Sequence, residues 1–134
     1  RPLVSVASGG ELSRIMLAIK TVMADRDDIE TLIFDEIDVG ISGRTAQKVS
    51  EKMAVIGRGH QVICITHLAQ IAAMADTHFL IEKKVEKNGT TTGIRRLSEK
   101  EEIKELARIL GGAKITETVL ENAREMKKLA REIK

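Results

Sequence analysis

Two adjacent acids, Asp35 and Glu36, directly follow the apolar run of residues 31–34 (TLIF). Such a short apolar run predicts a buried strand, and carboxylates at its end are costly unless a ligand uses them. A magnesium–nucleotide complex would use both acids. One carboxylate would hold Mg²⁺, mainly through water, and the other would accept the proton of an attacking water. The alternative is a plain strand end that emerges into solvent.

A second candidate for chemistry is the run Ser8-Gly9-Gly10-Glu11. Ser8 and Glu11 have the spacing of a capping box, and apolar residues recur at helical spacing over residues 12–23. Gly9 and Gly10 would let an anion approach the free backbone N–H groups of the first helical turn. The Ser8 hydroxyl could add a further donor. The alternative is a capped helix with a flexible entry.

His67 follows a second apolar run, residues 61–66 (QVICIT), which predicts another buried strand. Since ligands of parallel sheets sit at the carboxyl ends of the strands, we expect His67 at the same edge as Glu36, where it could donate to a phosphate oxygen. The alternative is a surface histidine or one satisfied within the fold. Residues 38–43 (DVGISG) form a loop beginning at Asp38. That loop could reach across an interface or serve as a plain connector.

The elements that would position these residues alternate between helix and strand. Apolar periodicity predicts helices near residues 46–56 and 68–75, and a hairpin of residues 79–85 and 90–97 around Asn88-Gly89. A helix capped by Ser98 and Glu101 ends at Gly111-Gly112, and a last helix runs over residues 119–133. We therefore expect an α/β fold: a largely parallel sheet flanked by helices, with a β-hairpin and C-terminal helices.

Composition excludes several classes of protein. The formal charge of +2 over 134 residues is too small to argue for a polyanion partner, and two Phe with no Tyr or Trp leave no platform for base stacking. Cys64 is the only cysteine, so no intrachain disulfide can form, and we expect it in the core of a protein from a reducing cytoplasm. No segment has the length and apolarity of a membrane span or signal peptide, and no ligand spacing indicates zinc.

Basic residues gather on the predicted hairpin. They could contact DNA phosphates, or they could protect a solvated hairpin edge against pairing with other strands. The residues are Lys83, Lys84, Lys87, Arg95 and Arg96.

Taken together, the motifs resemble an ABC-type ATPase head. Residues 7–13 (ASGGELS) resemble the signature motif, and residues 31–36 (TLIFDE) resemble a Walker B strand with its catalytic glutamate. Asp38 and the residues after it resemble the D-loop, and Thr66-His67 resembles the segment that carries the switch histidine. Ile37 and Glu11 replace residues typical of transporters. Residues 34–43, residues 65–72 (ITHLAQIA) and the Gly111-Gly112 break are similar to the RecN family of SMC-like ATPases, whose head lobes are separated by a long coiled coil.

This resemblance implies a mechanism in which ATP is clamped between two heads. Glu36 and His67 would be catalytic, and Asp35 would bind Mg²⁺. In the signature motif, Ser8, Gly9, Gly10 and Glu11 would bind the nucleotide of the second head, and Asp38 would link the two sites. It implies a bacterial, cytoplasmic, nucleoid-associated ATPase that forms a nucleotide-dependent homodimer, binds DNA and acts in recombinational double-strand-break repair.

The chain departs from an intact head in one respect, because it contains no G-x-x-x-x-G-K-[ST] phosphate loop. The family places that loop, Walker A, in an N-terminal lobe, so we expect residues 1–134 to be a C-terminal half that is inactive alone. A start at Arg1 without Met agrees with that expectation. Three alternatives remain: the head of another SMC-like chromosome-organising ATPase, a transporter's nucleotide-binding domain, and a non-enzymatic dimerisation or DNA-tethering module.

Overall fold

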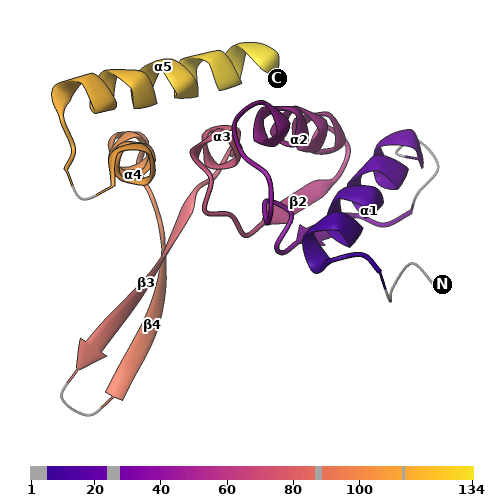
Figure 1. The fold of residues 1–134 in the computed structure, drawn as a ribbon, viewed down its shortest axis with the longest axis horizontal. Coiled ribbons are helices and arrows are strands. Elements are labelled where there is room, and N and C mark those ends of the chain that lie inside the picture. The colour runs from indigo at the N-terminus through magenta and orange to yellow at the C-terminus, as the bar shows by residue number, and fades with distance from the viewer. Residues whose placement is uncertain (1–5, 24–27, 87–88, 113) are drawn as a thin grey trace.

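The computed structural model describes residues 6–23, 28–86, 89–112 and 114–134. Helices and strands alternate along the first half of the chain, and a hairpin and two helices complete it (Figure 1). In order, the elements are α1 (Gly9–Met23), β1 (Thr31–Phe34), α2 (Gly43–Ile56), β2 (Gln61–Cys64), α3 (Ala69–Ala73), β3 (Phe79–Glu86), β4 (Gly89–Arg96), α4 (Glu99–Gly111) and α5 (Glu117–Ile133).

A two-stranded parallel sheet carries the acidic pair. β1 and β2 run side by side, with Ile33 opposite Ile63 and Phe34 opposite Cys64, so both strands end at the same edge. One face of this sheet packs against α1 and α2. The buried side chains of this first core are Leu17, Leu32, Phe34, Ile37, Val49, Met53, Ile56 and Ile71.

The opposite face of the β1–β2 sheet, which we call the bare face, is not covered by any element of the described residues. Ile33 is 68% exposed, and Ile63 and Ile65 are about half exposed. Strands of parallel sheets are ordinarily buried on both faces. The bare face is therefore a surface on which further structure could pack.

A second core joins α3, α4 and α5. Small side chains let the three helices approach closely, and Leu106 and Ala123 are fully buried among them. Lys127 and Glu102 are also buried there and form an ion pair at 3.0 Å between Nζ and Oε2. A buried pair of this kind avoids the cost of desolvating either charge alone.

The antiparallel hairpin of β3 and β4 extends away from the helices (Figure 1). Its Phe79, Ile81, Val85 and Ile94 side chains are all more than half exposed. Phe79, Ile81 and Val85 alternate along β3, and Ile94 pairs with Ile81, so all four lie on one face of the hairpin.

The predicted mixture of helices and strands is confirmed, but the expected largely parallel sheet is wrong in extent. Within the described residues, only β1 and β2 pair in parallel, and the hairpin forms a separate sheet. The predicted strand over residues 61–66 ends at Cys64, and the predicted helix over 68–75 is the short α3. The hairpin pairs Glu86 with Gly89, so Asn88 of the expected turn lies outside the described residues.

Candidate functional site

The acidic pair stands at the sheet edge where β1 ends, and both carboxylates are exposed. Glu36 adopts φ 58°, the left-handed conformation that non-glycine residues rarely occupy. Its N–H donates to the Asp35 Oδ1 at 2.9 Å, and its carbonyl accepts from the Val39 N–H at 3.1 Å. A conformation of this kind costs about 1–3 kcal/mol and persists only where neighbouring structure enforces it.

Asp38 lies two residues beyond Glu36 and turns inward. Its side chain is buried, and its Oδ2 accepts from the Thr66 hydroxyl at 2.6 Å and the His67 N–H at 2.9 Å. The His67 Nδ1 lies 3.0 Å from the same oxygen. Burial by itself raises the pKa of Asp38, but the bonds from Thr66 and His67 outweigh it, so the pKa lies below its usual value. Asp38 is therefore a carboxylate at neutral pH.

The start of α1 lies next to the acidic pair and Asp38. The Ser8 N–H donates to Glu11 Oε2 at 2.7 Å, and the Glu11 N–H donates to the Ser8 hydroxyl oxygen at 3.3 Å. This is the reciprocal capping box that the sequence predicts. The backbone and hydroxyl bonds from Ser8 lower the pKa of Glu11. The Ser8 hydroxyl also donates to the Glu11 carboxylate at 2.9 Å, so its proton is already engaged within this turn.

Gly9 and Gly10 pack against the acidic loop. A Cβ at Gly10 would lie 2.8 Å from the Glu36 carbonyl oxygen and 3.0 Å from that of Val39. A Cβ at Gly9 would lie 2.6 Å from the Glu36 Oε2. The helix start and the acidic loop therefore approach each other at a distance that glycine permits.

Two side chains that the sequence did not single out tie the same parts together. The Arg14 Nη1 donates to the carbonyl oxygens of Ile37 at 3.0 Å and Val39 at 2.8 Å. The Ser13 hydroxyl donates to the Asp35 carbonyl at 2.9 Å. Ser13 is the last residue of the run 7–13 and Arg14 follows it, but the carbonyl groups that they contact belong to residues 35–39, so no local spacing identifies the contacts.

The strand-tip site, defined as the start of α1, residues 35–38 and Thr66-His67, gathers most of the predicted residues. Asp35, Glu36 and His67 lie at the edge where β1 and β2 end, and Ser8 remains exposed, as the prediction requires. Asp38 differs, because its carboxylate contacts His67 of its own chain rather than facing outward to a second chain. Glu11 is occupied by its cap.

The strand-tip site could bind Mg²⁺ only if water and phosphate oxygens supplied most of the ligands. Asp35 offers one exposed carboxylate, and among the described residues no group of three or more His, Cys, Asp or Glu could hold a metal ion. Mg²⁺ commonly keeps several waters and takes one or two carboxylates together with phosphate oxygens. One protein ligand is thus compatible with a magnesium–nucleotide complex.

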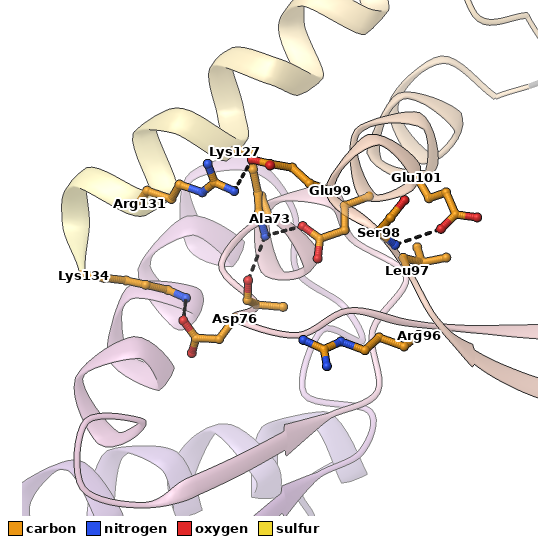
Figure 2. A pocket seen from close by; sticks show the side chains of 12 residues that line it. Ala73, Asp76, Arg96, Leu97, Ser98, Glu99, Glu101, Lys127, Arg131 and Lys134 are labelled. Carbon is orange, nitrogen blue, oxygen red and sulfur yellow. Dashed lines mark hydrogen bonds and ion pairs between the residues drawn. The ribbon is translucent and has the colours of Figure 1, made fainter.

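A pocket of about 680 Å³ lies elsewhere, between the ends of α3 and α5 and the start of α4 (Figure 2). Its lining carries both signs of charge, and most of these charges are paired with each other. Figure 2 shows Arg131 directed to Glu99, at 2.5 Å, and Lys134 directed to Asp76. Since these cations are already neutralised, we assign the candidate chemistry to the strand-tip site rather than to this pocket.

The basic residues of the hairpin do not form one surface. Lys83 and Arg96 belong to one face, and Lys84 and Arg95 to the other, while Lys87 lies outside the described residues. Arg95 pairs with Glu101 at 2.7 Å and with Glu82 at 3.7 Å. This arrangement agrees better with a solvated edge protected by charge.

Cys64 is partly buried against the first core, and burial raises the pKa of its thiol to about 12. A thiol with so high a pKa is little ionised at neutral pH, and the expected core position is met in part, because Cys64 packs against the first core without being fully buried. Within the part of the chain described, no helix has the length and apolarity to cross a membrane.

Comparison with known proteins gives the same family as the motifs. The chain is 49% identical over all 134 residues to the DNA repair protein RecN of Halalkalibacterium halodurans and 46% identical over all 134 residues to that of Bacillus subtilis. It is 46% identical over 125 residues, 93% of the chain, to RecN of Deinococcus radiodurans. The matches span 24%, 23% and 22% of these relatives, so the chain covers about a quarter of their length. No protein-family model matches.

Proposed function

This chain is homologous over its whole length to a C-terminal part of the RecN DNA repair proteins, and on that premise we propose that it is the C-terminal lobe of an ABC-type ATPase head. The intact protein hydrolyses ATP and acts on DNA in recombinational repair of double-strand breaks. The observation that carries the proposal is the strand-tip site. It presents two acids, an imidazole and a glycine-led helix start at one edge of the molecule.

In this proposal each acid has a separate task. Asp35 holds Mg²⁺ together with water and phosphate oxygens. Glu36 accepts the proton of the attacking water, and its exposed carboxylate is free to reach it. His67 contacts the γ-phosphate from the neighbouring strand end. In phosphoryl transfer, positioning and electrostatic stabilisation supply most of the rate enhancement.

The start of α1 acts on the nucleotide of a second head. Ser8 and Gly9 are exposed there. The Glu11 N–H of the first turn donates to Ser8, and the Gly9 and Gly10 N–H groups of the 15-residue α1 provide donors for phosphate oxygens. ATP bound between two heads thus closes a homodimer, and hydrolysis reopens it. Differential contact with ATP over ADP is what lets the nucleotide shift that equilibrium.

The rest of the protein completes the sheet. The bare face with Ile33, Ile63 and Ile65 would be an exposed apolar patch in isolation. About three quarters of the length of the matching relatives lies outside this segment, which is enough to supply the N-terminal lobe with Walker A. That lobe would cover the bare face. By itself, residues 1–134 would have no measurable ATP turnover.

A substitution of Glu36 by Gln in the full-length protein tests the catalytic role. The amide keeps the shape but cannot accept the proton, so we expect ATP turnover to fall by about 10²- to 10⁴-fold. ATP binding should stay within a few-fold of wild type. The matched control is Glu99→Gln, which removes an exposed carboxylate from the pocket of Figure 2. Turnover of Glu36→Gln within a factor of two of wild type would overturn the assignment.

A second substitution, Ser8→Arg, tests the shared interface. It adds bulk and charge where the partner's nucleotide would dock, so ATP-dependent dimers should disappear in light scattering. Asn122→Arg makes the same type of change at an exposed position of α5 and should leave dimers intact. If Ser8→Arg dimerises with ATP as wild type does, this end of α1 does not contact a second head.

A further inference from the structure

One oxygen of Asp38 accepts two hydrogen bonds and lies close to a ring nitrogen of His67. The Thr66 hydroxyl, the His67 N–H and the His67 Nδ1 all lie within 2.6–3.0 Å of Oδ2. The carboxylate is buried, with only 2% of Asp38 exposed. A buried carboxylate with this set of partners has one orientation, because any rotation would leave donors and acceptor unsatisfied.

This contact fixes the imidazole of His67. At this distance from a carboxylate oxygen Nδ1 must carry a proton, because two lone pairs would otherwise face each other, so Nε2 is the ring nitrogen left to face a ligand. The His67 side chain is 69% exposed although its Nδ1 lies 3.0 Å from the Asp38 Oδ2. Nε2 is therefore accessible at the strand-tip site, while the contact of Nδ1 with Asp38 limits rotation of the ring.

Asp38 is itself held in place by the neighbouring backbone. Arg14 bonds the carbonyl groups of Ile37 and Val39, the residues on either side of Asp38. The Ile41 N–H donates to the Asp38 carbonyl at 3.4 Å. The loop thus carries its carboxylate on a support anchored to α1, as a positioning group requires.

We propose that Asp38 is a positioning residue for His67: it holds the Nδ1–H side of the ring, and as a buried anion it stabilises the imidazolium that forms when Nε2 takes a proton from solvent and donates it in a hydrogen bond to the γ-phosphate oxygen of the nucleotide in the same head. The inference rests on the proposed ATPase function and adds a role that acts through His67 rather than on the substrate. The geometry favours this role over a link between two heads, because the Asp38 carboxylate is enclosed by donors of its own chain.

A double-mutant cycle in the full-length protein tests the proposal. Asn at position 38 can still accept hydrogen bonds but lacks the charge, so Asp38→Asn should lower kcat for ATP by about 10- to 100-fold, with KM changed less than about 2-fold. In a His67→Ala background, the same Asp38→Asn change should lower kcat by less than about 2-fold, since its target is gone. Asp76→Asn, an acid-to-amide change at an exposed position, should have no effect in either background.

The alternative is that Asp38 merely fastens the loop to β2. In that case Asp38→Asn would reduce kcat equally with and without His67, and the proposal would be overturned. It would also be overturned if Asp38→Asn turned over ATP at the wild-type rate while Glu36→Gln did not. That second pattern leaves the proposed ATPase function standing, so the two failures can be told apart.

A spectroscopic readout decides the matter without relying on turnover. Nitrogen-15 NMR of histidine-labelled full-length protein, recorded above the imidazole titration and assigned through His67→Ala, reports which ring nitrogen carries the proton. We expect the Nδ1–H form in wild type and a gain of the Nε2–H form in Asp38→Ala. An Nε2–H ring in wild type would contradict the inference even in a protein that does not hydrolyse ATP.

Discussion

Acidic side chains are exposed at the strand-tip site, whereas in the second core, of α3, α4 and α5 (the α3–α5 core), they are paired with cations. At the strand tips, Asp35 and Glu36 point outward and no cation of the described residues forms an ion pair with either. In the α3–α5 core, carboxylates meet cations of the same chain, as Lys127 meets Glu102 and Arg108 meets Glu105. The first arrangement leaves charge available for a ligand, and the second consumes it in the fold.

The difference separates two uses of polar residues. Pairing orients the helices and offsets part of the cost of desolvating buried charges, whereas the exposed Asp35 and Glu36 form no such pair with the described residues. Substitutions in the two regions should therefore affect different properties of the protein. Changes at the strand tips should affect turnover, and changes in the α3–α5 core should affect stability.

The largest stability effect should come from Lys127→Met. It leaves the Glu102 carboxylate buried without its cation and removes the bond from Nζ to the Ala75 carbonyl at 2.8 Å. Breaking a buried pair on one side costs about 3–5 kcal/mol of unfolding free energy, measurable by urea denaturation of the full-length protein. Turnover per folded molecule should not change.

The double variant Lys127→Met with Glu102→Leu is the control for Lys127→Met. It removes both charges, so most of the lost stability should return. If the single variant instead abolished turnover at full stability, the division between the two regions would fail.

An intermediate effect should come from the glycine pair of α1. A methyl group at Gly10 meets two backbone carbonyl oxygens that cannot move freely, so Gly10→Ala should cost about 1–3 kcal/mol. At Gly9, the methyl group meets the end of the flexible Glu36 side chain. Gly9→Ala should therefore leave stability nearly unchanged and instead displace the Glu36 carboxylate, lowering kcat. Equal destabilisation by both would show that α1 does not pack on the acidic loop.

The smallest effect should be a pH dependence in α4. The Ser98 backbone and hydroxyl bonds, with the Arg95 contact, lower the pKa of Glu101 to about 2 from 4.5. A carboxyl whose folded pKa is depressed stabilises the fold above its unfolded pKa and loses that contribution as pH falls. Glu101→Gln should thus remove part of the stability difference between pH 5 and pH 2 in thermal melts. An unchanged difference would show that this cap does not titrate in the native state.

Local patterns in the sequence predict a large part of this fold. Both capping boxes, at Ser8 and Ser98, and the pairing of two strands with the acids at their ends follow from spacing alone. The extent of β2 does not. The apolar run continues to Thr66, but Asp38, distant in the chain, takes the Thr66 hydroxyl and the His67 N–H, so the chain leaves the strand.

The residue types of the candidate site can be predicted from the sequence, but the hydrogen bonds that hold these residues in place cannot. The acids and the histidine stand at strand ends, which apolar runs reveal. Arg14 and Ser13 act on carbonyl groups of residues 35–39, and backbone acceptors leave no mark in a sequence. The inward turn of Asp38 is of the same kind, because it depends on how β2 lies beside β1.

The most direct measurement is the location of a bound metal–nucleotide complex. Spin labels placed one at a time at Ser42 (exposed, just after the acidic loop) and at Asp76 (beside the pocket of Figure 2) would sense Mn²⁺ that substitutes for Mg²⁺. In the full-length protein with other reactive cysteines replaced, we expect Mn²⁺–ATP to broaden the label at Ser42 and to leave the label at Asp76 unchanged. Broadening at Asp76 alone would place the nucleotide among the paired charges and contradict the strand-tip site.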